Sequence, residues 1–205
     1  MLSWLTRRLH RPPEADPAAF ATFLAEQAAF VAQKPAVDYC RVKAGVAEQS
    51  LFADPDFVEA LAHCRWQTFA AATPDILALA EGWLRPHAAG AEPALAAALA
   101  RIGRDFLGQA PAPEAERANL AATGAALESL LLAQQAAPPQ GGDRRPINAQ
   151  ATLLATLPVH PDQRRGETVA ITGALRFQLV AAQQRMEKRF DAAALAAALL
   201  RPAAA

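Results

Sequence analysis

The sequence contains few cysteines and few aromatic residues, and it has no excess of charge of either sign. Two cysteines among 205 residues cannot form a disulfide framework, so the sequence favours a reducing compartment such as the cytoplasm. Twenty basic residues balance twenty acidic ones, whereas nucleic-acid-binding proteins normally carry a basic surplus. We therefore expect no nucleic-acid partner.

Long hydrophobic runs are also missing. No window reaches the roughly 18 continuous apolar residues of a membrane-spanning helix. The N-terminal stretch MLSWLTRRLHRPPEAD lacks the apolar core of about 7–15 residues that a secretory signal needs. These absences indicate a soluble cytoplasmic protein, with contact at the inner membrane limited to its surface.

None of the common catalytic motifs occurs. The sequence has no G-x-S-x-G elbow, no P-loop, no Rossmann fingerprint and no H-E-x-x-H helix. Serine occurs only at Ser3, Ser50 and Ser129, and His160 lies beside Asp162 without a partner nucleophile. We therefore predict no catalytic residue and no cofactor, which weighs against an enzyme.

The residues that are present favour helices. Alanine supplies roughly a quarter of the chain, about three times its ordinary share, and it has the highest intrinsic helix propensity. Asp16-Pro17, Asp54-Pro55 and Thr73-Pro74-Asp75 each resemble a helix start, while Pro35 predicts a kink or break in the first long helix. We predict an all-α bundle of about six or seven helices.

The chain divides into four regions. Residues 1–13 form a basic amphipathic segment, and residues 14–137 contain the helices of the bundle. Residues 138–148 are rich in proline and glycine, which predicts a flexible linker. Residues 149–205 are expected to form C-terminal helices that pack on the same domain.

Polar side chains interrupt the apolar faces of the first two long helices. In the stretch VEALAHCRWQTF, the four neighbours from His63 to Trp66 point in different directions, but Arg65 shares the apolar face. Arg65 can extend its guanidinium from this face to solvent. If it is buried instead, it requires a carboxylate partner, and Asp38, Asp75 and Glu81 are the candidates. These polar residues form either a structural network or the floor of a binding cleft. The proposed binding residues are Lys34, Asp38, Tyr39, Arg41, Arg65 and Trp66.

Cys40 and Cys64 lie at similar heights if these two helices form an antiparallel hairpin. A disulfide, or a metal site completed by His63 and Asp38, is then geometrically feasible. Zinc sites usually contain a close pair such as C-x₂-C, and the sequence has none. We therefore expect two inert buried thiols and no metal.

Four stretches resemble helical proteins of alphaproteobacteria that are uncharacterised, some of them labelled as esterases. The stretches are AAFVAQKPAVDYCRVKAGV, LFADPDFVEALAHCRWQTFAAATPDILALAEGWLRPH, LPVHPDQRRGE and ITGALRFQLVAAQQRMEKRF. The resemblance covers about half of the chain and implies a helical bacterial protein, but it contains no motif diagnostic of an activity. The alanine and arginine bias also favours a bacterial source.

The leading functional prediction is a non-catalytic intracellular adaptor or assembly factor that binds a protein partner through a helical groove. The alternative is a small-molecule-binding protein or an unrecognised esterase-like hydrolase. Its ligand would occupy a cleft between the first two long helices, around residues 27–41 and 59–68.

The first eleven residues predict weak contact with a membrane surface. Apolar and basic side chains alternate there with helical spacing, as in helices that lie on anionic bilayers. These residues are Leu2, Trp4, Leu5, Leu9, Arg7, Arg8 and Arg11. We predict weak flotation with anionic liposomes that depends on residues 1–11. Equal flotation of the full-length and truncated chains would contradict this prediction.

Overall fold

The computed structural model describes residues 13–201, and within that range the chain is an all-α bundle. Seven helices have eight or more residues, and α3 is a single turn. The amphipathic segment predicted at the N-terminus lies outside the described residues. None of the described helices combines the length and apolar character needed to cross a bilayer. The helices are α2 (Pro17–Ala44), α3 (Glu48–Leu51), α4 (Pro55–Leu84), α5 (Glu92–Gln109), α6 (Glu114–Gln134), α7 (Ala149–Thr156), α8 (Thr168–Arg189) and α9 (Ala192–Leu199).

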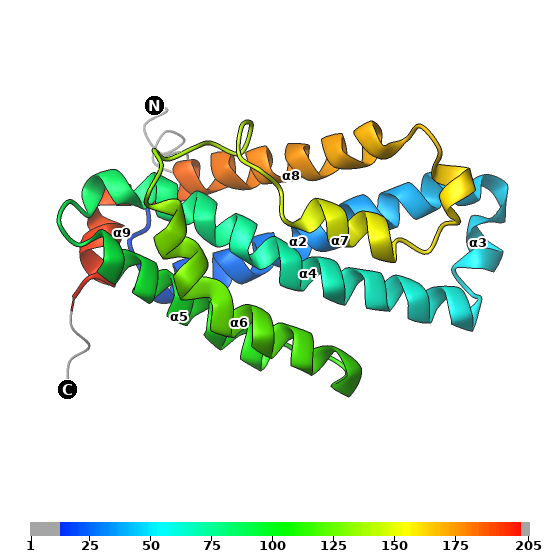
Figure 1. Cartoon of the computed structure of the whole chain (residues 1–205), viewed down its shortest axis with the longest axis horizontal. Helices are drawn as coiled ribbons and strands as arrows, with labels where there is room; N and C mark the ends of the chain where they lie inside the picture. Colours follow the sequence, from blue (N-terminus) through cyan, green and yellow to red (C-terminus); the bar gives the residue numbers. More distant parts are fainter. Residues whose placement is uncertain (1–12, 202–205) are drawn as a thin grey trace, which may run out of the picture.

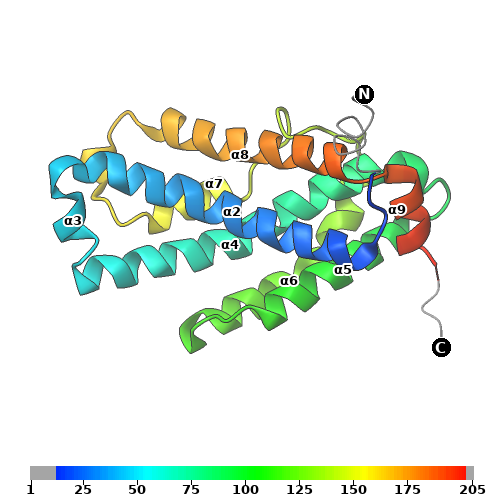
Figure 2. The same ribbon diagram turned by 180° about the vertical axis from the view of Figure 1, so that it is seen from behind.

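Helix α4 forms the centre of the bundle and contacts every other helix of eight residues or more. Helices α2 and α4 form an antiparallel hairpin that turns through α3, and α5 and α6 form a second hairpin beside it (Figures 1 and 2). Helix α8 packs along α2, while α7 contacts α4 and α8. An isolated bridge between Glu14 and Phe190 joins the start of the described chain to the end of α8.

The helix-start signals were correct at two positions and wrong at the third. The side chains of Asp16 and Asp54 accept hydrogen bonds from the first turns of α2 and α4. Pro74, by contrast, lies inside α4, which continues unbroken to Leu84. An internal proline costs about 3 kcal/mol, but almost every residue from Thr68 to Glu81 is buried, and this packing outweighs the cost. Pro35 likewise lies within α2, which continues to Ala44 without a break.

Asp75 lies within α4 but caps the start of a different helix, α7. Its carboxylate is fully buried within α4 and accepts hydrogen bonds from the backbone N–H groups of Asn148 and Ala149, both at 3.0 Å. The Asn148 side-chain amide donates a third at 2.7 Å. Asp75 therefore caps the N-terminus of α7 from another helix. Burial raises the pKa of Asp75, while these donors and Arg145 act in the opposite direction.

The segment from residue 138 to residue 148 contains no helix, yet it is anchored at several points. Arg176 of α8 donates hydrogen bonds through Nη1 to the carbonyl oxygens of Gly142, Asp143 and Arg145, at 2.9–3.0 Å. A Cβ atom at Gly142 would lie 3.2 Å from the backbone of α8, so the close approach favours glycine. The flexibility of this segment stays a prediction, but its backbone is hydrogen-bonded to the bundle.

Small residues allow the helices to approach closely. Gly103 of α5 faces Leu77 and Leu127, and a Cβ atom there would lie within 2.6 Å of both side chains. Many core positions on α2, α4 and α5 are alanine. The alanine-rich composition therefore serves helix contact as well as helix propensity.

Cys40 and Cys64 are free, buried thiols on the two arms of the α2–α4 hairpin. Burial raises the pKa of Cys40 to about 12, and the neighbouring Cys64 acts in the same direction. The pKa of Cys64 is also raised by burial. Asp38 and His63 bind other partners, Lys34 and Glu116. Among residues 13–201, no three His, Cys, Asp or Glu side chains are grouped to hold a metal ion.

We predict that Asp75→Asn lowers the free energy of unfolding by roughly 1–3 kcal/mol, because an amide replaces a carboxylate that faces only donors. Urea denaturation measures the loss, and amide exchange at Ala149 should accelerate more than elsewhere. Asp105→Asn, at an exposed position of α5, is the matched control. Equal stability of the two variants would show that the cap of α7 is dispensable.

The cysteines give a second prediction. Because thiolate is the reactive form, a thiol pKa near 12 should slow alkylation of native Cys40 at pH 8 by about a thousandfold relative to the unfolded chain. Iodoacetamide labelling with and without urea, read by mass spectrometry, measures the ratio. Rapid labelling of the native protein, or a disulfide between the two cysteines, would disprove inert burial.

Candidate functional site

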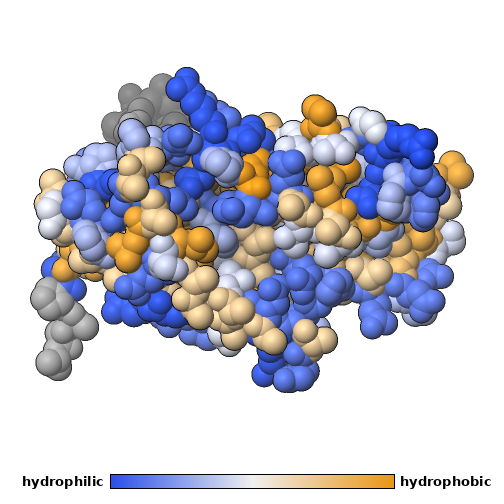
Figure 3. Space-filling model, viewed as in Figure 1, coloured by the Kyte–Doolittle hydropathy of each residue, from blue (hydrophilic) through white to orange (hydrophobic). Residues whose placement is uncertain are grey.

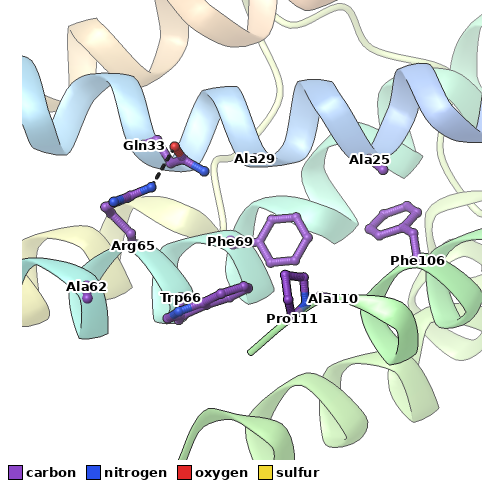
Figure 4. Close-up of a pocket in the computed structure, with 10 residues that line it drawn as sticks. All are labelled: Ala25, Ala29, Gln33, Ala62, Arg65, Trp66, Phe69, Phe106, Ala110 and Pro111. Carbon is purple, nitrogen blue, oxygen red and sulfur yellow. Dashed lines mark hydrogen bonds between the residues drawn. The ribbon is translucent and has the colours of Figure 1, made fainter. Parts of the chain in front are cut away.

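An opening lies between α2 and α4 and is closed at one end by the connection from α5 to α6. Its volume is about 560 Å³. Arg65 lies at one end and Phe106 at the other, with the remaining aromatic side chains between them (Figure 4). We call this opening the α2–α4 cleft. Its lining residues are Ala25, Ala29, Gln33, Ala62, Arg65, Trp66, Phe69, Phe106, Ala110 and Pro111.

The cleft exists because α2 presents small side chains where α4 presents large ones. Ala25, Ala29 and Gln33 are spaced four residues apart and therefore lie along one ridge of α2. Opposite this ridge, Trp66 and Phe69 meet edge to face with ring centroids 6.0 Å apart. Phe106 continues the aromatic series 6.1 Å beyond Phe69. The result is an apolar trough with an aromatic floor.

Arg65 supplies the charge of the cleft. Its Nη2 donates to Oε1 of Gln33 at 2.8 Å, and its Nε is buried without an acceptor. The carboxylate partner was expected only for a fully buried Arg65, and the side chain is only partly buried. The candidate carboxylates bind other groups. Asp38 pairs with Lys34, Asp75 caps α7, and Glu81 pairs with Arg85. The Arg65 cation is therefore held by a neutral amide.

The other predicted binding residues lie outside the cleft and do not form one cluster. Lys34 and Asp38 form a half-exposed ion pair at 2.6 Å, one turn apart on α2. Arg41 pairs with Glu48 at 3.2 Å and lies over the ring of Phe52 near the α2–α4 turn. These contacts stabilise the end of the hairpin. Of the six predicted residues, only Arg65 and Trp66 line the cleft.

Tyr39 joins α2 to the start of α8. Its hydroxyl donates to Glu167 at 2.5 Å, and Lys43 binds the other carboxylate oxygen of Glu167 at the same distance. The hydrogen bonds from Lys43 and Tyr39 lower the pKa of Glu167, whereas burial and this carboxylate raise the pKa of Tyr39. The arrangement connects two helices and faces no described cavity.

Sequence reasoning missed Phe106 and Pro111 because they belong to the second hairpin, and no local pattern shows that it closes the cleft. It also missed the buried Glu116, which binds His63 at 2.6 Å and Gln67 at 2.6 Å. The spacing of Ala25 and Ala29 was a usable signal, since two alanines one turn apart on a helix leave room beside them.

The cleft is suited to binding. Among the described residues that line the cleft, Arg65 is the only ionisable one. The lining therefore contains neither a nucleophile nor a proton-transfer group. On the face shown in Figure 3, hydrophobic residues are separated by hydrophilic ones and form no continuous patch.

Comparisons with protein-family models, curated proteins and solved structures give no match. The resemblance to helical alphaproteobacterial proteins stays a prediction. Any functional assignment therefore depends on the geometry of the α2–α4 cleft.

Proposed function

We propose that the protein is a non-catalytic adaptor that binds a helix of a protein partner in the α2–α4 cleft. The observation that supports this most is the pairing of an aromatic floor with a cation, Arg65, that binds no carboxylate among residues 13–201. An amphipathic helix would place apolar side chains over Trp66 and Phe69. An Asp or Glu of the same helix would bind Arg65.

The residue types favour a protein partner. Tryptophan, tyrosine and arginine are the side chains that most often dominate binding energy at protein interfaces. A carboxylate that binds Arg65 would also provide acceptors for the guanidinium, which the Gln33 amide only partly satisfies. The cleft lies between two helices, the usual setting for helix-in-groove recognition.

The volume of the cleft supports a second candidate. About 560 Å³ falls within the range of small-molecule sites, so an apolar compound with an acidic group would also match the lining. The two candidates differ in the molecule that is bound to the protein in the cell, which is another protein for the adaptor and a small compound for the second candidate. The adaptor proposal includes a cytoplasmic setting and no cofactor.

A photo-crosslinking amino acid at Ala62 would test the proposal in cells. We expect one defined protein adduct that is absent when the same group replaces the exposed Arg101. A bound small compound in native mass spectrometry, together with no protein adduct, would reject the adaptor and support the second candidate.

The purified partner then tests the residues of the cleft. We predict that Arg65→Glu and Trp66→Ala each raise Kd by at least about tenfold, equivalent to roughly 1.4 kcal/mol of binding free energy. Arg101→Glu makes the same charge change on the surface of α5 and should leave Kd within about twofold. Equal weakening by Arg65→Glu and Arg101→Glu would indicate general electrostatics and disprove recognition in the cleft.

A further inference from the structure

A second pocket, of about 260 Å³, lies where the 138–148 segment crosses the ends of α4 and α6. One wall is the last turns of α4, another is the end of α6, and the third is the proline-rich segment itself. We call it the Arg145 pocket. Its lining residues are Ala78, Gly82, Arg85, Gln134, Ala137, Pro138, Pro139, Gln140, Arg145 and Pro146.

Arg145 is an almost fully buried cation, with 7% of its surface exposed. Its Nη2 donates to Oε1 of Gln134 at 2.8 Å, and its Nε is buried without an acceptor. A buried guanidinium normally lies against a carboxylate, because an unpaired buried charge is costly. Here an amide oxygen is its hydrogen-bond partner.

The two carboxylates whose charge acts on Arg145 are already occupied. Asp75 accepts from Asn148 and Ala149. Glu81 accepts two hydrogen bonds from Arg85 and one from Gln135, at 2.6–2.9 Å. Both act on Arg145 through their charge, but neither binds it and neither lines the pocket.

Arg85 adds a second guanidinium to the lining. It is held by Glu81 and by the backbone carbonyls of Ala137 and Gln134. The described lining therefore contains two guanidinium groups and no carboxylate, and only that of Arg85 is paired with a carboxylate, Glu81, outside the lining. Its three prolines contribute no backbone N–H, so the arginine side chains and the two glutamine amides are its main donors.

We propose that the Arg145 pocket binds a small oxyanion, namely a phosphate or carboxylate group, with the Arg145 guanidinium as its direct ligand. Guanidinium donors match the paired oxygens of both groups. The Gln134 amide nitrogen and Arg85 lie beside Arg145 to complete the site. This site shares no residue with the α2–α4 cleft, so it is independent of the proposed function.

Bound anion would also hold the 138–148 segment against α4 and α6, because its ligands come from all three. The wild-type protein should therefore show a melting temperature that rises with anion concentration at constant ionic strength. Inorganic phosphate and acetate, each titrated against a chloride background, are the probes. Calorimetry and amide NMR shifts around Gln134 and Arg145 report saturable binding.

Matched arginine variants locate the site. We predict that Arg145→Gln weakens binding of the effective probe at least tenfold. Arg144→Gln, at the adjacent and highly exposed arginine, should leave it within twofold. Circular dichroism checks that Arg145→Gln is folded, and Arg145→Lys offers a variant that keeps the charge while losing the planar fork. Its affinity should fall between those of the wild type and Arg145→Gln.

The outcomes are distinct. Saturable binding of phosphate alone assigns a phosphate group, and binding of acetate assigns a carboxylate. Binding of neither probe to the folded wild-type protein overturns the proposal. It is also overturned if Arg144→Gln and Arg145→Gln weaken binding equally, since the anion would then respond only to surface charge.

Discussion

The burial of the second half of α4 is the constraint on which the rest of the structure depends. From Thr68 to Glu81 this helix has almost no solvent-facing side, yet it contains two carboxylates, Asp75 and Glu81. A buried carboxylate must find donors within the protein. Distant segments supply most of those donors: Asn148 and Ala149 for Asp75, and Gln135 for Glu81. Arg85, one turn further along at the end of α4, supplies the others for Glu81. The connection from α6 to α7 is therefore positioned by polar groups of α4 as well as by apolar packing.

Two arginines show the same unusual arrangement. Arg65 and Arg145 each donate Nη2 to a glutamine oxygen at 2.8 Å, and each has a buried Nε without an acceptor. Each also lines an opening at the edge of the core. A glutamine keeps a guanidinium in place without neutralising it, so its charge stays available to an anion from outside the chain. A carboxylate in the same position would satisfy the cation internally.

The sequence predicted the all-α fold class, two of the three helix starts and the pair of helices between which the cleft lies. The helix starts follow from local signals, the caps at Asp16 and Asp54. Only part of the proposed set of six binding residues lines the cleft, because polar residues on one helix face can bind different neighbours. Arg65 and Trp66 reach the cleft, while Lys34, Asp38 and Arg41 bind within or beside their own helix. The predicted helix start at Pro74 and Asp75 was wrong because tertiary packing keeps both residues inside α4. Phe106 could not be predicted because it reaches the cleft from a hairpin more than 30 residues further along the chain.

The cap that α4 supplies to α7 has a consequence for the order of folding. Helix α7 has eight residues and no side-chain cap of its own, and isolated helices of that length are unstable in water. Its N-terminus is completed by a carboxylate 73 residues earlier in the chain. We therefore expect α7 to assemble late, on a surface that the two hairpins have already built, and to be the first helix to detach when the protein opens locally.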